Sequence, residues 1–168
     1  NRHYSTILVF ISLFFSSLVF SQETLFDYYP PSPVPDRIML NLTAQPDQSM
    51  AVTWRTSLAV KKGLVQLSLA TPSPDFMDSI QTFNATTEAF ISDRNGANYH
   101  SVVMTGLKSE TQYAYRVGDE KHWSEWAHFK TASKEKEPLS FIYFGDAQNN
   151  VKSMWSRTIR GAYSQMPK

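Results

Sequence analysis

The sequence predicts a mainly β protein, in which an antiparallel β-sandwich is followed by the first βα unit of an α/β domain. Over residues 37–131, seven short runs with strand character are separated by turn signals about every 8–12 residues. From residue 139 the pattern changes to a continuous apolar run, followed by apolar residues at helical spacing. An aromatic content of 14% also suits a β-rich core.

The strands of the sandwich are predicted from the alternation of side-chain character. In the second run, Met50, Val52 and Trp54 alternate with smaller or more polar neighbours. The run at 80–91 is weaker, and we interpret it as a pair of strands across Asn84-Ala85. The seven predicted runs are 38–43, 50–55, 64–69, 80–91, 99–104, 112–117 and 126–131.

Two aromatic residues are expected to organise the core. Leu107 lies six residues before Tyr113 at the start of a strand. This is the spacing of a tyrosine corner, in which the hydroxyl bonds to the backbone near the preceding loop. Trp54 is expected to fill the space between the two sheets. We interpret both residues as structural.

Segments of distinct composition flank the sandwich. Arg2 and His3 precede an apolar run at 7–20, which is typical of a secretory signal peptide, with a retained membrane anchor as the alternative. Four prolines within 30–35 indicate an extended linker. The predicted parts are a signal peptide at 1–21, a Pro-rich linker at 22–36, the sandwich at 37–131, a linker at 132–138, and the start of an α/β domain at 139–168.

The signal-like segment and the composition limit the expected cellular location and the expected classes of binding partner. We expect a secreted, periplasmic or extracellular protein without stable membrane association after signal cleavage. Lys+Arg 16 against Asp+Glu 15 gives no basic excess, which argues against a nucleic-acid partner. There is no Cys, so disulfides and thiolate metal sites are excluded. Asn41 and Asn84 begin glycosylation sequons, whose occupancy is left open, as is the oligomeric state.

Asp146 is the candidate metal ligand. The predicted strand runs into Gly145-Asp146, and a helix is expected from about Lys152. Open α/β sheets place their ligands at the carboxyl ends of strands. A carboxylate is also a hard oxygen donor suited to Mn, Fe or Zn. From the residues alone, a helix N-cap or loop-capping role for Asp146 stays open beside the ligand role.

Short motifs occur in a specific order along the chain. They are Thr53-Trp54-Arg55-Thr56, Thr105-Gly106-Leu107, Tyr113-Ala114-Tyr115-Arg116-Val117-Gly118-Asp119, Trp123-Ser124, Phe129-Lys130-Thr131 and Phe144-Gly145-Asp146. The first five resemble the N-terminal fibronectin-type-III-like domain of purple acid phosphatases. The last resembles the first metal-binding motif of the metallophosphoesterase domain in that family. The resemblance covers roughly 37–150.

This resemblance implies the N-terminal part of a metal-dependent acid phosphatase that hydrolyses phosphate monoesters. Asp146 is implied as a terminal ligand of a ferric ion in a dinuclear centre, beside a second iron, zinc or manganese. Two ions about 3.5–4 Å apart supply a bound hydroxide and neutralise phosphoryl charge. Gln148 departs from the family, where Gly is common at that place, and this bears on the loop geometry. The later ligand motifs of the family are missing from these residues, so we expect the fragment itself to be inactive.

The remaining polar candidates are interpreted as structural. The four histidines, His3, His100, His122 and His128, show no ligand spacing such as His-x-His. Asp119 and Glu120 are expected in a hairpin turn, with a role at the rim of a substrate site as the alternative. Two other functions stay open: a fibronectin-III-like binding module with an aromatic patch at Trp123 and Trp126, and an accessory domain without catalysis.

Overall fold

The computed structural model describes residues 30–165, apart from 94, 137, 139 and 148–153. The chain divides into two compact units, one that ends at Lys134 and one at Glu135–Lys168. In the described residues no helix is long and apolar enough to cross a membrane. The predicted signal peptide lies outside the described residues.

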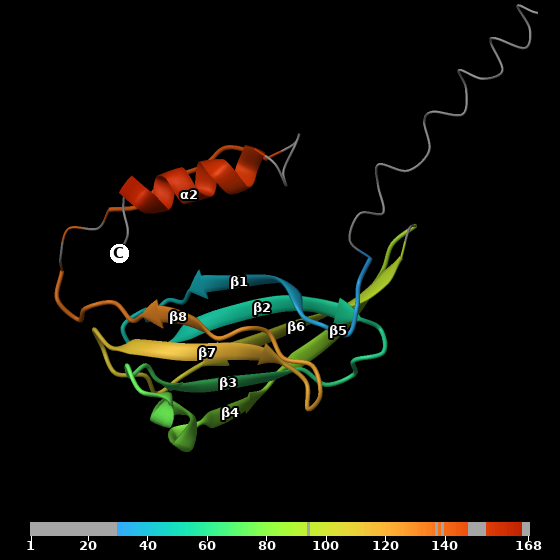
Figure 1. Cartoon of the computed structure of the whole chain (residues 1–168), viewed down its shortest axis with the longest axis horizontal. Helices are drawn as coiled ribbons and strands as arrows, with labels where there is room; N and C mark the ends of the chain where they lie inside the picture. The colour runs from blue at the N-terminus through green and yellow to red at the C-terminus, as the bar shows by residue number, and fades with distance from the viewer. Residues whose placement is uncertain (1–29, 94, 137, 139, 148–153, 166–168) are drawn as a thin grey trace, which may run out of the picture. The chain divides into compact units, whose positions relative to one another are not determined.

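The first unit is a sandwich of two four-stranded antiparallel sheets (Figure 1). One sheet has the strand order β1-β2-β6-β5, and the other has the order β4-β3-β7-β8. A short 3-10 helix, η2 (Pro74–Ser79), precedes β4. The strands are β1 (Asp36–Leu42), β2 (Met50–Ser57), β3 (Leu64–Leu69), β4 (Gln81–Asn84), β5 (Thr86–Ile91), β6 (Gly96–Met104), β7 (Gln112–Gly118) and β8 (Ala127–Lys130).

The predicted sandwich is confirmed, and so are the two strands at 80–91, but the expectation that they form a pair is wrong. This stretch forms β4 and β5, and they do not pair with each other. β4 pairs with β3, whereas β5 pairs with β6 in the opposite sheet. The chain changes sheets at Ala85, whose N–H donates to the carbonyl of Gly63 at 2.9 Å. Alternation within one run cannot show which sheet a strand joins, because both sheets present the same period of two.

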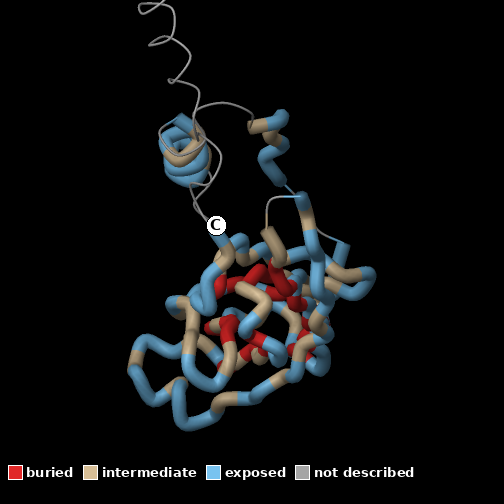
Figure 2. Tube along the Cα trace, turned by 90° about the vertical axis from the view of Figure 1, so that its right-hand side faces the viewer, coloured by how far each residue is buried: buried red, intermediate tan, exposed pale blue. Residues whose placement is uncertain are grey.

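The core lies between the two sheets, as the buried segments in Figure 2 show. Trp54 in β2 is 1% exposed, as expected for a residue that fills the space between sheets. Its indole stacks on the ring of His100 in β6, with ring centroids 5.1 Å apart. The other large residues of the cluster come from both sheets and include Val52, Val65, Leu67, Met104, Tyr115, Val117 and Phe129.

The predicted tyrosine corner is confirmed. The backbone N–H of Lys108 donates to the Tyr113 hydroxyl at 2.9 Å. The Tyr113 ring is 7% exposed and stacks on Phe129 of β8, with ring centroids 5.6 Å apart. Thr131 closes the same end of the sandwich, because its hydroxyl donates to the carbonyl of Lys108 and accepts from the N–H of Thr111.

The start of the sandwich lies inside the predicted linker. β1 begins at Asp36, so the last residue of the predicted linker already belongs to a strand. Asp36 pairs with the guanidinium of Arg55 in β2, which is only 3% exposed. The hydrogen bond that Arg55 donates to Asp36, together with the charge of that carboxylate, outweighs burial and raises the pKa of Arg55. The N–H of Ser57 also donates to the carbonyl of Ser32, which attaches the proline-rich segment to β2.

The second unit contains the predicted helix but not the predicted strand. α2 spans Ser156–Gln165, which agrees with the helical spacing of Trp155, Ile159 and Ala162. The described residues at 140–147 form no strand, so the prediction of a strand at 139–145 is wrong there. A strand needs a neighbouring strand to pair with, and none of the described strands pairs with this segment.

Candidate functional site

Asp146 lies in the irregular segment that precedes α2, and its side chain is exposed. It is ten residues before Ser156, the first residue of α2. Phe144 packs edge-on against Trp155, with ring centroids 5.1 Å apart. This contact joins the loop before Asp146 to the residue that precedes α2. The role of Asp146 as a metal ligand stays a prediction.

The described residues do not fit a complete dinuclear metal centre. Nowhere in the described ranges do three or more His, Cys, Asp or Glu side chains gather as ligands would. Asp146 could supply one carboxylate, but a dinuclear centre needs several ligands for two ions. We therefore derive no catalytic step from this part of the chain.

His100 is a core residue with both ring nitrogens bonded. Its Nε2 lies 2.7 Å from the hydroxyl of Thr56, and its Nδ1 lies 2.8 Å from the hydroxyl of Thr87. Burial lowers the pKa of His100, against a smaller opposing effect of the Asp119 charge. A methyl group at Gly63 would come within 2.7 Å of both His100 and Trp54, so only glycine lets the backbone approach this pair. His100 therefore serves the core.

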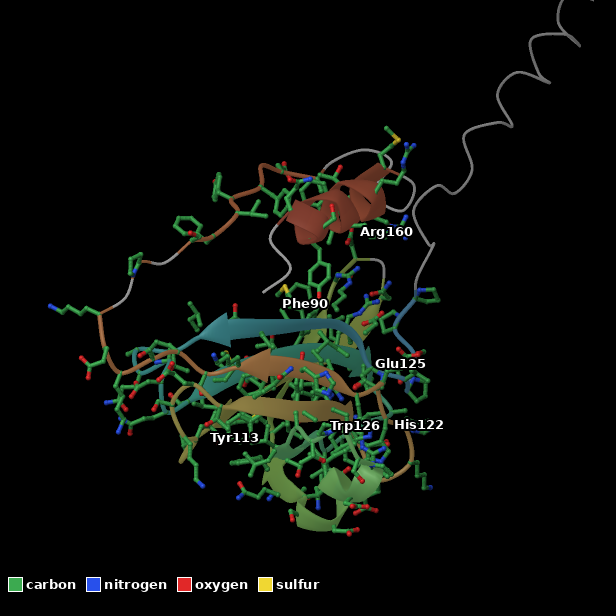
Figure 3. The ribbon with its side chains drawn as sticks, turned by 60° about the vertical axis from the view of Figure 1, so that its left-hand side comes forward. Phe90, Tyr113, His122, Glu125, Trp126 and Arg160 are labelled. Carbon is green, nitrogen blue, oxygen red and sulfur yellow. The ribbon has the colours of Figure 1, made fainter. Side chains whose placement is uncertain are left out.

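Asp119 organises the turn after β7. Its carboxylate accepts from the backbone N–H groups of Lys121 and His122, and its second oxygen lies 3.2 Å from His122 Nδ1. Partial burial opposes ionisation, but these hydrogen bonds outweigh it and lower the pKa of Asp119. The carboxylate is thus engaged in the turn, whereas the side chain of Glu120 is exposed. His122 lies at this end of the sandwich, away from Tyr113 (Figure 3).

Trp123 and Trp126 enclose Arg116 on the outer side of β7. The guanidinium carbon of Arg116 lies 4.6 Å from the centre of the Trp123 ring and 4.8 Å from that of Trp126. Its Nε donates to the side-chain oxygen of Gln66 at 2.7 Å. Cation–π contacts of this kind stabilise a loop against a strand. We call these three residues the Trp–Arg–Trp ladder.

The ladder uses the ring faces that a binding platform would need. Trp123 also lies against Gly118, where an added methyl group would come within 3.0 Å of the indole. Trp126 makes an edge-on contact with Phe76 of η2, with ring centroids 5.0 Å apart. Both indoles are only partly exposed. The predicted aromatic patch is therefore largely occupied by the protein itself.

Sequence reasoning did not identify Arg116 as a partner of the two tryptophans. A signal was present, because Arg116 is a strand residue followed closely by Trp123-Ser124-Glu125-Trp126. This signal can be interpreted only when it is known which residues of β7 face outward. Arg116 points out of the sandwich, whereas Tyr115 and Val117 point into the core.

Comparison with known proteins agrees with the fold. A sequence profile of the purple acid phosphatase N-terminal domain matches residues 35–131. The chain belongs to the purple acid phosphatase N-terminal domain family. This match confirms the resemblance drawn from the five ordered motifs within the sandwich. The residues of the purple acid phosphatase N-terminal domain are those of the sandwich, and Asp146 lies beyond them.

Two solved structures are similar to the chain at low sequence identity. The fn3 domain of human contactin 1 is 15% identical, with 72% of this chain and 96% of that chain covered and a TM-score of 0.44. The third fibronectin III domain of human KIAA0343 protein is 12% identical, with 72% and 98% covered and a TM-score of 0.40. No curated protein matches the chain.

Proposed function

We propose that this chain is the N-terminal part of a secreted, metal-dependent acid phosphatase that hydrolyses phosphate monoesters. The observation that carries the proposal is the family match over residues 35–131. It is supported by Phe144-Gly145-Asp146, which follows the sandwich closely and resembles the first metal-binding motif of the metallophosphoesterase domain.

In this proposal Asp146 is one ligand of a dinuclear centre of iron with a second iron, zinc or manganese. Its carboxylate supplies a hard oxygen donor and offsets part of the metal charge. The remaining ligands come from other parts of the whole protein, because the described residues hold no such cluster. The 168 residues alone are therefore expected to be inactive.

The sandwich has a structural role in this proposal. Its polar candidates are engaged within the fold: His100 with two threonines, Asp119 with its own turn, and Arg116 with two tryptophans. Groups committed in this way are not available to activate water or to hold a phosphoryl group.

The test uses the protein encoded by the complete reading frame. We expect metal to copurify with it, and we expect turnover of p-nitrophenyl phosphate. Asp146→Ala should lower both metal content and turnover, because one ligand is removed. Asp78→Ala is the matched control, since Asp78 is an exposed carboxylate on η2 of the sandwich and should change neither.

The outcome also separates the alternatives. A folded, metal-free and inactive protein would favour a fibronectin-III-like binding or accessory module without catalysis. Metal-dependent turnover by the purified 168-residue chain would contradict the expectation that this part is inactive. Retained metal and activity in Asp146→Ala would remove Asp146 from the site.

A further inference from the structure

A groove opens at one end of the sheet that contains β3, β4 and β7. At this end Leu64 of β3 pairs with Asn84 of β4 on one side and with Gly118 of β7 on the other. The loop at 58–63 precedes Leu64 and the turn at 119–122 follows Gly118, so both project from this end of the sheet. They enclose a groove of about 500 Å³, which is within the size range of small-molecule sites.

The rim of the groove is positively charged. Lys61 and Lys62 come from the first loop and Lys121 from the turn, and all three side chains are exposed. Within the described part of the chain, these three side chains form no ion pair. Three ammonium groups without a carboxylate partner therefore border one groove.

The two acidic residues of the groove offset part of this charge. Asp119 accepts two backbone hydrogen bonds and contacts His122 within its own turn, and it keeps its negative charge there. Glu120 is exposed and is the second opposing charge among the lining residues. Three lysines against two carboxylates leave one net positive charge at the groove.

We propose that this groove binds a small anion that carries several phosphate groups. Lysine binds phosphate as a compact point charge with three rotatable N–H donors, and it needs no planar partner. A single exposed pair of charges contributes little, at most about fivefold in affinity. Only an anion with several charged groups can contact the three lysines at once. The groove should therefore prefer anions with several phosphate groups over anions with one.

The rest of the lining suits such a ligand. Ala59, Val60 and Leu64 form an apolar floor, and Asn84 adds a neutral amide. The groove has no aromatic residue, so it lacks the stacking surface that a sugar or a nucleobase would use. This binding site is independent of the proposed phosphatase activity, because it lies wholly within the sandwich.

The experiment uses the 168-residue chain with tripolyphosphate, at low ionic strength, followed by calorimetry and by amide chemical shifts in NMR. We expect shifts to concentrate at 59–64 and 118–122, and tripolyphosphate to bind at least about tenfold more tightly than orthophosphate. The affinity should fall as salt is added, because these charges are exposed to solvent. Equal affinity for the two anions would overturn the proposal.

Charge-reversal variants provide the decisive comparison. The triple variant Lys61→Glu, Lys62→Glu, Lys121→Glu should lose at least about tenfold in affinity for tripolyphosphate. The matched control Lys108→Glu, Lys130→Glu, Lys134→Glu changes the net charge equally, and its lysines lie toward the opposite end of β7. The control should change affinity by less than about threefold. Equal loss in both variants would show general attraction only and would overturn the proposal.

Two further arms keep the result interpretable. Glu120→Gln should raise the affinity about twofold, because it removes one of the two opposing charges. A hexaglutamate peptide that binds the groove as tightly as tripolyphosphate would overturn the assignment to phosphate groups.

Circular dichroism of each variant checks that the sandwich is folded. If the triple variant is unfolded, Lys121→Glu alone should lower the affinity several-fold, and an unchanged affinity would contradict the proposal.

Discussion

The sandwich and the segment after it use similar residue types but reach different states. In the sandwich, each strand has a hydrogen-bonded neighbour, and Trp54, Tyr113 and Phe129 are buried. In the segment 140–147, Phe141 is 76% exposed and Tyr143 is 87% exposed, and no strand forms among these residues. Apolar character alone thus does not make a strand, because the backbone also needs a partner.

The largest expected difference between the two regions is in amide hydrogen exchange. Amides of β2 and β6, which pair with strands on both sides, should exchange on the order of a thousandfold or more slowly than those of 140–147. Exchange opening of central strands needs near-global unfolding, whereas irregular backbone is already open. Mass spectrometry of the exchanged chain measures this. Strong protection at 140–147 would show that the segment finds a partner in solution.

Removal of the central indole should destabilise the sandwich strongly. Trp54→Ala leaves a cavity beside His100 and should lower the free energy of unfolding by about 3–5 kcal/mol. Trp155→Ala is the control in the second unit, where the indole is partly exposed, and it should leave the urea midpoint of the sandwich unchanged. A loss below about 1 kcal/mol for Trp54→Ala would contradict the assignment of Trp54 to the core.

The tyrosine corner should contribute a smaller amount. Tyr113→Phe keeps the stacked ring but removes the acceptor of the Lys108 N–H. The expected loss is about 1–2 kcal/mol in urea denaturation, because a partly buried donor is left unpaired. Tyr163→Phe in α2 is the control, since that ring is 67% exposed, and no change is expected there. Equal free energies of unfolding for the two variants would show that the tyrosine corner does not contribute to the stability of the fold.

The smallest expected effect is the pH dependence that His100 contributes. Burial lowers its pKa in the folded state, so the unfolded chain binds the proton more readily. This contribution to stability is complete above the unfolded pKa of about 6.5 and is lost as the pH falls toward the lower folded value. His100→Gln should therefore show a flatter unfolding midpoint between about pH 7 and pH 5 than the parent chain. An unchanged slope would contradict a role for His100 in this range.

The sequence predicted the sandwich well because its signals are local. Alternation identified the strands, and the spacing of Leu107 and Tyr113 identified the corner that the Lys108 hydrogen bond confirms. The sheet change at Ala85 depends on strand partners that are distant in the chain. The contact of Arg116 with two tryptophans depends on which side of β7 the Arg116 side chain occupies. The same limit applies to the strand at 139–145, because its partner is not specified by its own residues.

The candidate site was less predictable than the fold. Asp146 was selected from a motif, and its capping alternative stays open beside the ligand role. Its role as a metal ligand stays a prediction, because the described residues hold no cluster of ligands around it. The sequence did not predict that three lysines border one groove. Lys61-Lys62-Gly63 also fits an ordinary turn, and Lys121 is distant from it in sequence.

The crossing at Ala85 has a consequence for how the two sheets keep their alignment. Asn84 is the last residue of β4 and Thr86 the first of β5, so one residue connects strands in different sheets. A connection of one residue cannot lengthen to absorb a shift of either strand. A one-residue slip of β4 along β3 would therefore shift β5 along β6 and turn the side chains of β5 to the opposite face. Ala85 therefore locks the register of one sheet to that of the other, and an inserted residue at this point would release both.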